Sequence, residues 1–233
     1  MSWIEDAKRN AVLTAVEPVR NGWVIGLGSG STVAHAVKEL ARLRRDRKME
    51  FSVVPTSYQM EQMATSHGLR TIGLNEIVNV DYAIDGADQV QEGSLNLIKG
   101  GGGALLREKV VDSAARCLVI VVDQSKIVKT LGGRQSVPLE VLPFAFKVVQ
   151  AEITKMGGRA KLRENMGKVG PVISDNGNFL VDADFGHIRN PAKLDRHLKS
   201  IPGILETGLF IRLVDRAYVG QKNGDVKTIT PSR

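Results

Sequence analysis

The sequence has few of the features that several common classes of protein need. Only one of its 233 residues is a cysteine, Cys117, so no disulfide can form within the chain and a reducing compartment is expected. Aromatic residues make up 5%, too few for the stacking platforms of single-strand nucleic-acid binders. No apolar stretch approaches the roughly 18 residues of a membrane span, and acids follow Met1 where a signal peptide would be basic. We therefore expect a cytoplasmic protein without a membrane partner.

The charge of the chain is positive. Lys and Arg number 32 against 25 Asp and Glu, a formal net charge of +7, and the sequence pI is near 9.6. This surplus predicts an anionic partner, either nucleic acid, a membrane surface or a small phosphorylated metabolite. The densest basic run, 42–48, follows a helical stretch, where cations suit the C-terminal end of the helix dipole. We interpret it as a solvated helix end, so no nucleic-acid partner is expected.

Helical and strand patterns alternate in the first half of the chain. Apolar periodicity predicts helices over 7–16, 32–43, 57–67 and 104–115, and strands over 23–27, 51–54, 71–72, 82–84 and 118–122. This alternation is typical of an α/β fold with a Rossmann-like, mostly parallel sheet flanked by helices. In open sheets of this kind ligands bind beyond the carboxyl ends of the strands. The functional residues are expected there.

The pattern changes after Asp123. It predicts a short strand between Pro138 and Pro143, a helix over 144–156, a strand over 159–163, a hairpin from 172–173 to 179–181, and a helix over 192–199. This order favours a smaller α+β domain of the ferredoxin-like kind. We expect it to span 132–205, inserted into a catalytic Rossmann-like domain formed by 1–131 and 206–233.

A glycine-rich segment, 26–32, lies between a predicted strand and a predicted helix. Backbone N–H groups at a helix start, together with the hydroxyls of Ser31 and Thr32, can bind a phosphate. The segment is not the dinucleotide fingerprint, which would need glycine in place of Ser31 or Val33. Nor is it a Walker loop, which needs Gly-Lys-Ser/Thr. The alternative is a tight turn with a helix cap.

Two aspartates, Asp85 and Asp88, stand on either side of Gly86 and Ala87 directly after a predicted strand. Either aspartate alone is as often a turn or helix-cap residue. Two together could also bind a metal, but the four histidines show no accompanying ligand spacing, and the phosphate-transfer motif usual at magnesium sites is absent. We therefore expect acid–base or hydroxyl-binding chemistry and no metal.

A run of four glycines, 100–103, follows Lys99 and precedes a predicted helix that contains Glu108. Such a run sacrifices chain entropy, and its exposed backbone donors can stabilise a developing oxyanion, to which Lys99 adds a positive charge. Glu108 lies about one turn into the helix. A lone helical glutamate would by default pair with neighbouring cations on a solvated face. The adjoining glycine turn favours a catalytic role instead.

Lys126 ends the segment 123–126, which follows another predicted apolar strand. It is either an ordinary surface lysine or a cation that holds a substrate phosphate. The sequence position is compatible with both interpretations.

Together these motifs resemble those of the A-type ribose-5-phosphate isomerases. Their order and spacing match over nearly the whole chain, in segments 28–32, 85–88, 99–109, 123–126, 137–141, 157–159, 174–178, 201–203 and 208–210. The resemblance implies that ribose 5-phosphate and ribulose 5-phosphate interconvert through an enediolate, in the non-oxidative pentose phosphate pathway, without metal or organic cofactor. It also implies a homodimer or homotetramer, with 132–205 providing contacts in the larger form.

The resemblance further implies roles for individual residues. Glu108 would be the base that moves a proton between C1 and C2. The residues implied in ring opening and hydroxyl binding are Asp85, Asp88 and Lys99. Those near the developing oxyanion are Gly100, Gly101 and Gly102. The remaining substrate-binding residues, mainly at the phosphate end, are Ser29, Gly30, Ser31, Thr32, Lys126 and Lys8, with Gly86 and Ala87 beside the aspartates.

Three features depart from the family pattern. Ser29 stands where threonine is frequent, which preserves the hydroxyl. Gln89 stands where glutamate is frequent, which removes a charge beside the site. The stretch 164–171, next to Arg163, is longer than in compact members, and the sequence assigns it no role.

Two alternative functions stay open at this point. A related sugar-phosphate enzyme, such as an amino-sugar-phosphate deaminase or a lactonase, would be favoured by a His-containing acid–base motif, which the sequence lacks. A non-enzymatic sugar-phosphate sensor of a transcription regulator would need a DNA-binding module. The strand expected near Trp23 leaves no room for one before it.

Overall fold

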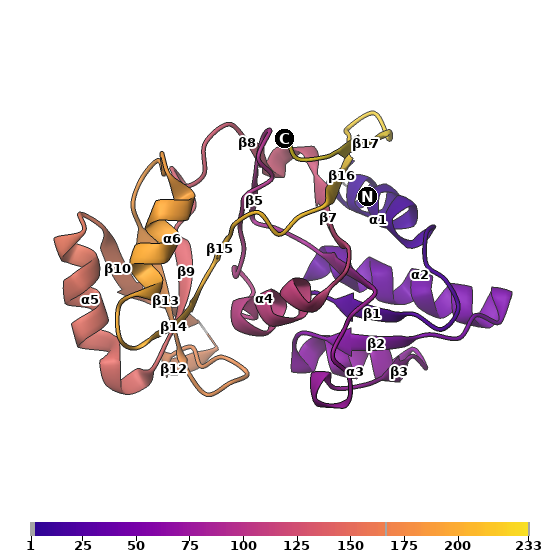
Figure 1. Ribbon diagram of the computed structural model, residues 1–233, viewed down its shortest axis with the longest axis horizontal. Helices are drawn as coiled ribbons and strands as arrows, with labels where there is room; N and C mark the ends of the chain where they lie inside the picture. Colours follow the sequence, from indigo (N-terminus) through magenta and orange to yellow (C-terminus); the bar gives the residue numbers. More distant parts are fainter. Residues whose placement is uncertain (1–2, 166, 233) are drawn as a thin grey trace.

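The computed structural model describes residues 3–165 and 167–232, and its largest element is a seven-stranded sheet (Figure 1). In spatial order the strands are β17 (Val226–Ile229), β16 (Arg216–Gly220), β7 (Leu118–Asp123), β4 (Tyr82–Asp85), β1 (Val24–Leu27), β2 (Ser52–Pro55) and β3 (Arg70–Thr71). All neighbours are parallel except β16 and β17. The predicted Rossmann-like sheet is therefore confirmed.

Helices cover both faces of this sheet. The helices of the large lobe are α1 (Trp3–Val16), α2 (Ser31–Arg47), α3 (Tyr58–Ser66) and α4 (Leu105–Ala114). Residues of α1, α2 and α3 share one apolar cluster with Val119 and Val121 of β7, whereas α4 shares the opposite cluster with Leu118 and Ile120. Successive strand residues point to opposite faces, so β7 is apolar from Leu118 to Val122 because both of its faces are buried.

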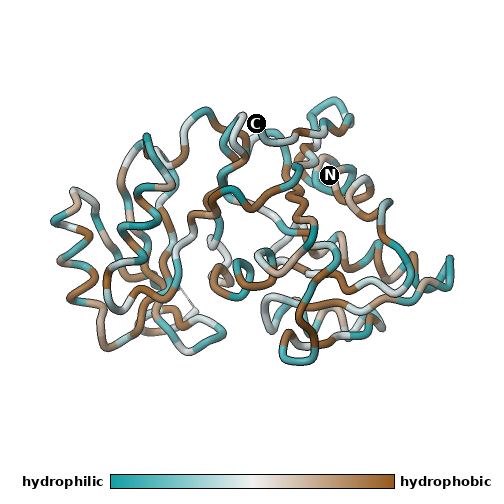
Figure 2. The backbone as a smooth tube through the Cα atoms, viewed as in Figure 1, coloured by the Kyte–Doolittle hydropathy of each residue, from teal (hydrophilic) through white to brown (hydrophobic). Residues whose placement is uncertain are grey.

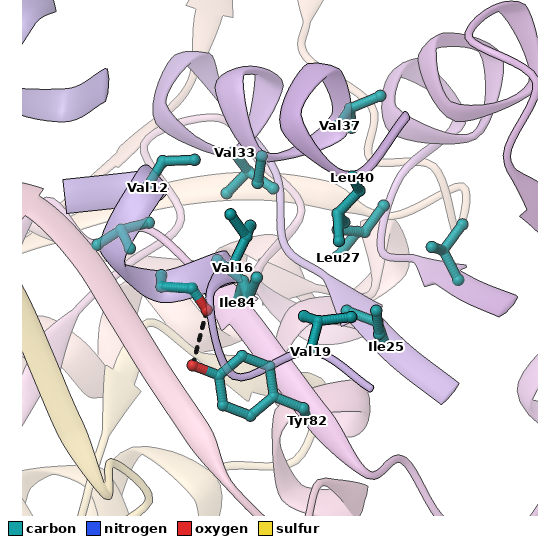
Figure 3. Close-up of a cluster of buried hydrophobic side chains, with 14 of the residues drawn as sticks. Val12, Val16, Val19, Ile25, Leu27, Val33, Val37, Leu40, Tyr82 and Ile84 are labelled. Carbon is teal, nitrogen blue, oxygen red and sulfur yellow. Dashed lines mark hydrogen bonds between the residues drawn. The ribbon is translucent and has the colours of Figure 1, made fainter. Parts of the chain in front are cut away.

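The first of these clusters is drawn in Figure 3, where α2 side chains lie over β1 and β4. The hydroxyl of Tyr82 donates a hydrogen bond to the Ala15 carbonyl at 2.9 Å, which joins β4 to the end of α1. At its far end α2 reaches Arg47, and Lys48 follows with a left-handed φ of 52°. This end is hydrophilic (Figure 2), so the basic run is a solvated helix end as predicted.

The strand order reverses direction between β1 and β4. From β1 the chain adds β2 and β3 on one side, and it then returns to add β4, β7 and β16 on the other. The carboxyl ends of β1 and β4 thus face a crevice at a topological switch point, which is where open α/β sheets bind ligands.

A smaller lobe lies beside the large sheet (Figure 1). Its elements are β9 (Val137–Val141), η3 (Pro143–Ala145), α5 (Phe146–Lys155), β10 (Arg159–Leu162), β13 (Phe179–Asp184), α6 (Pro191–Lys199) and β14 (Ile204–Thr207). The strands pair antiparallel in the order β10-β13-β9-β14. This βαββαβ arrangement is the predicted ferredoxin-like one. The lobe has an apolar cluster that includes Leu139, Val149 and Leu198, and its boundaries at 132 and 205 stay a prediction.

Short segments connect the two lobes. A four-stranded sheet runs in the order β15 (Leu209–Phe210), β6 (Leu97–Ile98), β5 (Gln89–Gln91) and β8 (Ile127–Val128). The remaining elements are η1 (Leu74–Glu76), η2 (Gln124–Lys126) and the hairpin of β11 (Glu164–Asn165) with β12 (Lys168–Pro171). That hairpin occupies the stretch 164–171, in which Met166 lies outside the described residues. No helix among the described residues is long and apolar enough to cross a membrane.

Two local predictions differ from the structure in detail. Pro138 does not precede its strand but is the second residue of β9, tolerated because it lies beyond the end of the pairing with β14, which stops at Leu139. The hairpin at Asn176-Gly177 forms, with Gly177 at a φ of 81°. Its first side is irregular, because 172–173 pairs with 179–180 through one bridge, Ile173 to Phe179, and a backbone hydrogen bond from Leu180 to Val172 rather than as a regular strand. The loop is also bound by Glu140, whose Oε1 accepts hydrogen bonds from Ser174, Asn176 and Asn178.

Candidate active site

The predicted site residues converge at the switch point. A cavity of about 240 Å³ opens there, lined by Lys8, Ser29, Gly30, Ser31, Thr32, Gly86, Ala87, Asp88, Lys99, Gly100, Gly101, Gly102, Glu108 and Lys126. Asp85, the last residue of β4, is fully buried beside it. A larger cavity, of about 620 Å³ between β3, η1 and α4, contains none of the predicted residues. The smaller cavity is therefore the candidate active site.

The turn from β1 to α2 forms one wall of the cavity. A Cβ atom on Gly28 would lie 1.8 Å from Oδ1 of Asp85, so only glycine lets the turn pass directly over that carboxylate. The N–H of Ser29 donates to Glu108 Oε1 at 3.3 Å, and the Ser29 hydroxyl lies within 2.9 Å of Thr56 Oγ1 and 2.8 Å of Ser57 Oγ. Ser29 thus positions Glu108 through its backbone.

One end of the cavity is suited to an anion. The helix α2 begins at Ser31, with Gly30 as its N-cap, so unpaired backbone N–H groups and the positive end of the helix dipole are directed there. The ammonium group of Lys8 donates to Ser31 Oγ at 3.1 Å and pairs with Glu5 at 2.8 Å. Lys126 reaches the same cavity from η2, after the end of β7. Two cations and a helix start are therefore available to a phosphate.

Lys99 lies at the centre of the buried charges. Its Nζ is 2.9 Å from Asp85 Oδ2 and 3.3 Å from Glu108 Oε2, and it donates to the Gly86 carbonyl at 2.7 Å. It also lies 5.3 Å from the centre of the Phe210 ring. Because these side chains are almost wholly excluded from solvent, the ammonium group is the counter-charge that keeps the two carboxyl groups together.

The surroundings shift the acidity of these groups. Burial and the nearby Asp85 carboxylate raise the pKa of Glu108 to about 7, against the attraction of Lys99. Burial also raises the pKa of Asp85, which Lys99 opposes. For Lys99 burial acts to lower the pKa, but Asp85 and Glu108 outweigh it and raise the pKa above its ordinary value. Glu108 is therefore poised to take up and release a proton near neutral pH.

The glycine turn forms the opposite wall. The N–H of Gly101 donates to Asp88 Oδ2 at 2.7 Å. A Cβ on Gly101 would lie 2.7 Å from Asp88 Oδ1, so glycine is needed for this close approach. Gly102 has open space beside it on the cavity side. Asp88 and the backbone of the turn are thus held together at the cavity wall.

Sequence reasoning missed a third buried acid, Asp112. It lies on α4 four residues after Glu108, on the same helix face, and is 3% exposed. Its carboxyl group contacts that of Asp85, and neither oxygen accepts a hydrogen bond from an N–H or O–H donor of the described residues. Burial, followed by the Asp85 charge, raises the pKa of Asp112 well above its ordinary value. The helical spacing from Glu108 was the signal that could have identified it.

Other predicted features lie away from the chemistry. Gln89 makes a reciprocal pair of hydrogen bonds with the Gly132 backbone, at 3.0 and 2.8 Å. Within the described ranges, no histidine lines the cavity, and no group of three or more His, Cys, Asp or Glu is arranged to hold a metal ion.

Several known proteins are similar to this chain over nearly its whole length. Residues 52–224 match the family model described as ribose 5-phosphate isomerase A (phosphoriboisomerase A). The chain is 46% identical over 223 residues to ribose-5-phosphate isomerase A of Methanosarcina acetivorans, covering 96% of this chain and 94% of that protein. It is similar to the structure of ribose 5-phosphate isomerase A from Methanocaldococcus jannaschii, with a TM-score of 0.93, 42% identity and coverage of 97% and 99%. A D-ribose-5-phosphate isomerase in complex with phospho-erythronic acid gives a TM-score of 0.94 at 38% identity, with the same coverage.

The raised pKa of Glu108 predicts how stability depends on pH. The folded-state pKa is about 7 against an ordinary 4.5, so between these values the folded protein binds the extra proton. This group therefore lowers the free energy of unfolding as pH rises through that window. We expect the free energy of unfolding of Glu108→Gln to exceed that of the wild type. The difference should grow as pH rises from acidic values and level off above neutrality, at about 1–3 kcal/mol.

Urea unfolding of both proteins over this pH range measures the difference. Glu61→Gln, which changes an exposed glutamate of α3, is the control and should show no such growth. A stability difference between Glu108→Gln and wild type that stays constant with pH would contradict the prediction.

Proposed function

Because the chain belongs to the ribose 5-phosphate isomerase A family, we propose that Glu108 is the base that moves a proton between C1 and C2 of its substrate. The chain is an aldose–ketose isomerase that interconverts D-ribose 5-phosphate and D-ribulose 5-phosphate, in the non-oxidative branch of the pentose phosphate pathway. The observation that carries the role of Glu108 is its position: the carboxyl group sits in the cavity between the Lys99 ammonium group and the Ser29 N–H.

The proton transfer uses one group in both directions. The Glu108 carboxylate takes the proton from C2 of the open-chain aldose, and the carbonyl oxygen at C1 becomes part of an enediolate. The same carboxylic acid then returns its proton to C1. The hydroxyl at C2 gives up its proton as it becomes the ketone, and the oxygen at C1 takes up that proton to become a hydroxyl. A pKa of about 7 for Glu108 suits both steps, because the group is neither too weak to accept the proton nor too strong to release it.

The negative charge that develops on the enediolate oxygens requires nearby donors. The Lys99 ammonium group and the N–H groups of the turn 100–102 line the same cavity and provide a fixed positive field. Asp85 holds Lys99 in place at 2.9 Å. Asp88, at the cavity wall, accepts hydrogen bonds from substrate hydroxyls and assists opening of the furanose ring.

The phosphate binds at the other end of the cavity. Ser31 and Thr32 present the first N–H groups and hydroxyls of α2, and Lys8 and Lys126 supply positive charge. A dianionic phosphate at a helix N-terminus is stabilised by both. This arrangement fixes the sugar with its reactive carbons toward Glu108.

The first prediction from this function concerns turnover by Glu108→Gln. Glutamine keeps the shape of the side chain but cannot accept the proton, so kcat should fall by roughly 10²–10⁴-fold. Binding of ribose 5-phosphate should change little, because the phosphate contacts are untouched. Steady-state kinetics with an equilibrium binding measurement separate the two effects. A variant with near-wild-type kcat would move the role of base to another residue.

The second prediction concerns the phosphate end. Lys126→Ala should raise KM for ribose 5-phosphate far more than it affects residual turnover of unphosphorylated ribose. Only the phosphorylated sugar loses an ion pair with Lys126. Lys129→Ala is a matched control, since Lys129 is exposed and does not line the cavity. Equal losses on both sugars, or an equal effect of Lys129→Ala, would argue against a phosphate role.

The third prediction concerns assembly and location. We propose a cytoplasmic homo-oligomer, dimer or tetramer, in which the small lobe provides contacts in the larger form. Leu142, Phe144 and Val148 support this, because they expose 44%, 95% and 58% of their surface on one part of that lobe. Light scattering should give at least twice the 25.3 kDa of the chain. A monodisperse, fully active monomer would exclude the oligomer without affecting the reaction.

A further inference from the structure

One cation of the small lobe reaches across to the glycine turn. Arg163 lies directly after β10, and its Nη1 is 3.0 Å from the Gly100 carbonyl oxygen and 3.1 Å from that of Gly101. Its side chain is 16% exposed. The contact therefore joins a nearly buried guanidinium group of one lobe to the backbone of the catalytic cavity in the other.

The guanidinium group is held from behind by Asp182 of β13. Nε of Arg163 donates to Asp182 Oδ2 at 3.0 Å, and Nη2 donates to Oδ1 at 2.5 Å. Such a two-bond pairing of arginine with a carboxylate fixes the plane of the guanidinium group. The remaining nitrogen, Nη1, is thereby directed at the turn.

The direction of the glycine peptides follows from these bonds. A trans peptide is planar, so its C=O and N–H point opposite ways, and the described residues contain no cis bond. With the Gly100 oxygen on Arg163, the N–H of Gly101 points away from Arg163 and donates to Asp88 at 2.7 Å. With the Gly101 oxygen also on Arg163, the N–H of Gly102 points away in turn, and Gly102 lines the cavity.

We propose that Arg163 is a positioning residue for the isomerisation, which fixes two consecutive peptides of the glycine turn so that their N–H groups face Asp88 and the developing oxyanion. Glycines without side chains cannot hold this conformation by packing and would lose entropy on ordering. The hydrogen bond within the turn, from the Gly103 N–H to the Gly100 oxygen at 3.0 Å, holds only the first of the two peptides. A cation on the carbonyl side also polarises each peptide and strengthens its N–H as a donor. The proposal rests on the oxyanion role of the turn given above. It makes the oxyanion site a joint product of both lobes.

The test compares two cross-strand pairs. Arg163→Met removes the contact, whereas Arg159→Met removes an equivalent pair on the same strands, since Arg159 bonds Asp184 at 2.6 Å but is 87% exposed and does not contact the turn. We expect Arg163→Met to lower kcat about 10- to 100-fold, less than the 10²–10³ of deleting an oxyanion donor outright, with KM nearly unchanged. Arg159→Met should leave both constants unchanged.

A binding measurement distinguishes a positioning role of Arg163 from a role that merely holds the two lobes together. Inhibition by 4-phosphoerythronate, whose carboxylate stands in for the enediolate oxygens, should weaken in Arg163→Met, while inhibition by inorganic phosphate should not. Arg163→Lys keeps the charge but loses the two-bond pairing with Asp182, so its kcat should fall between those of wild type and Arg163→Met. If Arg163→Met does not fold, the kinetics of Arg163→Lys and Asp182→Asn are measured instead. Both variants should then show a loss that is confined to kcat.

Two results would overturn the proposal. One is an unchanged kcat in folded Arg163→Met or in its two substitutes. The other is an equal weakening of both inhibitors, which would indicate a general loosening of the cavity. Failure of the proposed function is distinguishable, because it would appear as retained turnover in Glu108→Gln, whatever Arg163→Met does.

Discussion

A single ammonium group among three buried carboxyl groups is the constraint on which the rest of the structure depends. Lys99 Nζ touches Asp85 and Glu108, and Asp112 contacts Asp85 from the side of α4. One positive charge cannot neutralise three negative ones, and an unpaired buried charge is very costly. The cluster must therefore retain protons, because it has more carboxyl groups than cations. This excess contributes to the raised pKa of Glu108, about 7, and thus helps to hold that pKa near neutrality.

Elements from both lobes of the fold meet around this cluster. The switch point of the large sheet brings the end of β1 and the end of β4 together, so Gly28 can lie directly over Asp85. Helix α4 supplies Glu108 and Asp112 from the other face of the sheet. The glycine turn closes the cavity, and it is bound on its outer side by Arg163 of the small lobe. Each wall thus comes from a different part of the chain.

Local pattern carried much of this information. The βα alternation predicted the parallel sheet, because apolar period and turn residues are properties of short segments. The βαββαβ order of the small lobe followed from the same signals. Neighbours outside the segment decided the details that differ. Pro138 is part of a strand because the pairing with β14 ends before it, and the loop after 172–173 is held by Glu140 as well as by the pairing of the hairpin.

By itself the sequence determined which residues are unusual and near which strand ends they fall: two aspartates, a lysine, a glycine run and a glutamate, in an order that resembles one family. Only the tertiary structure decided how they are paired. The salt bridges of Lys99, the burial of Asp112 and the reach of Arg163 join residues on different elements, and no local periodicity encodes such distances. Packing of the sheet against α4 and the small lobe excludes the solvent, and that exclusion is the main reason why the pKa of Glu108 rises to about 7.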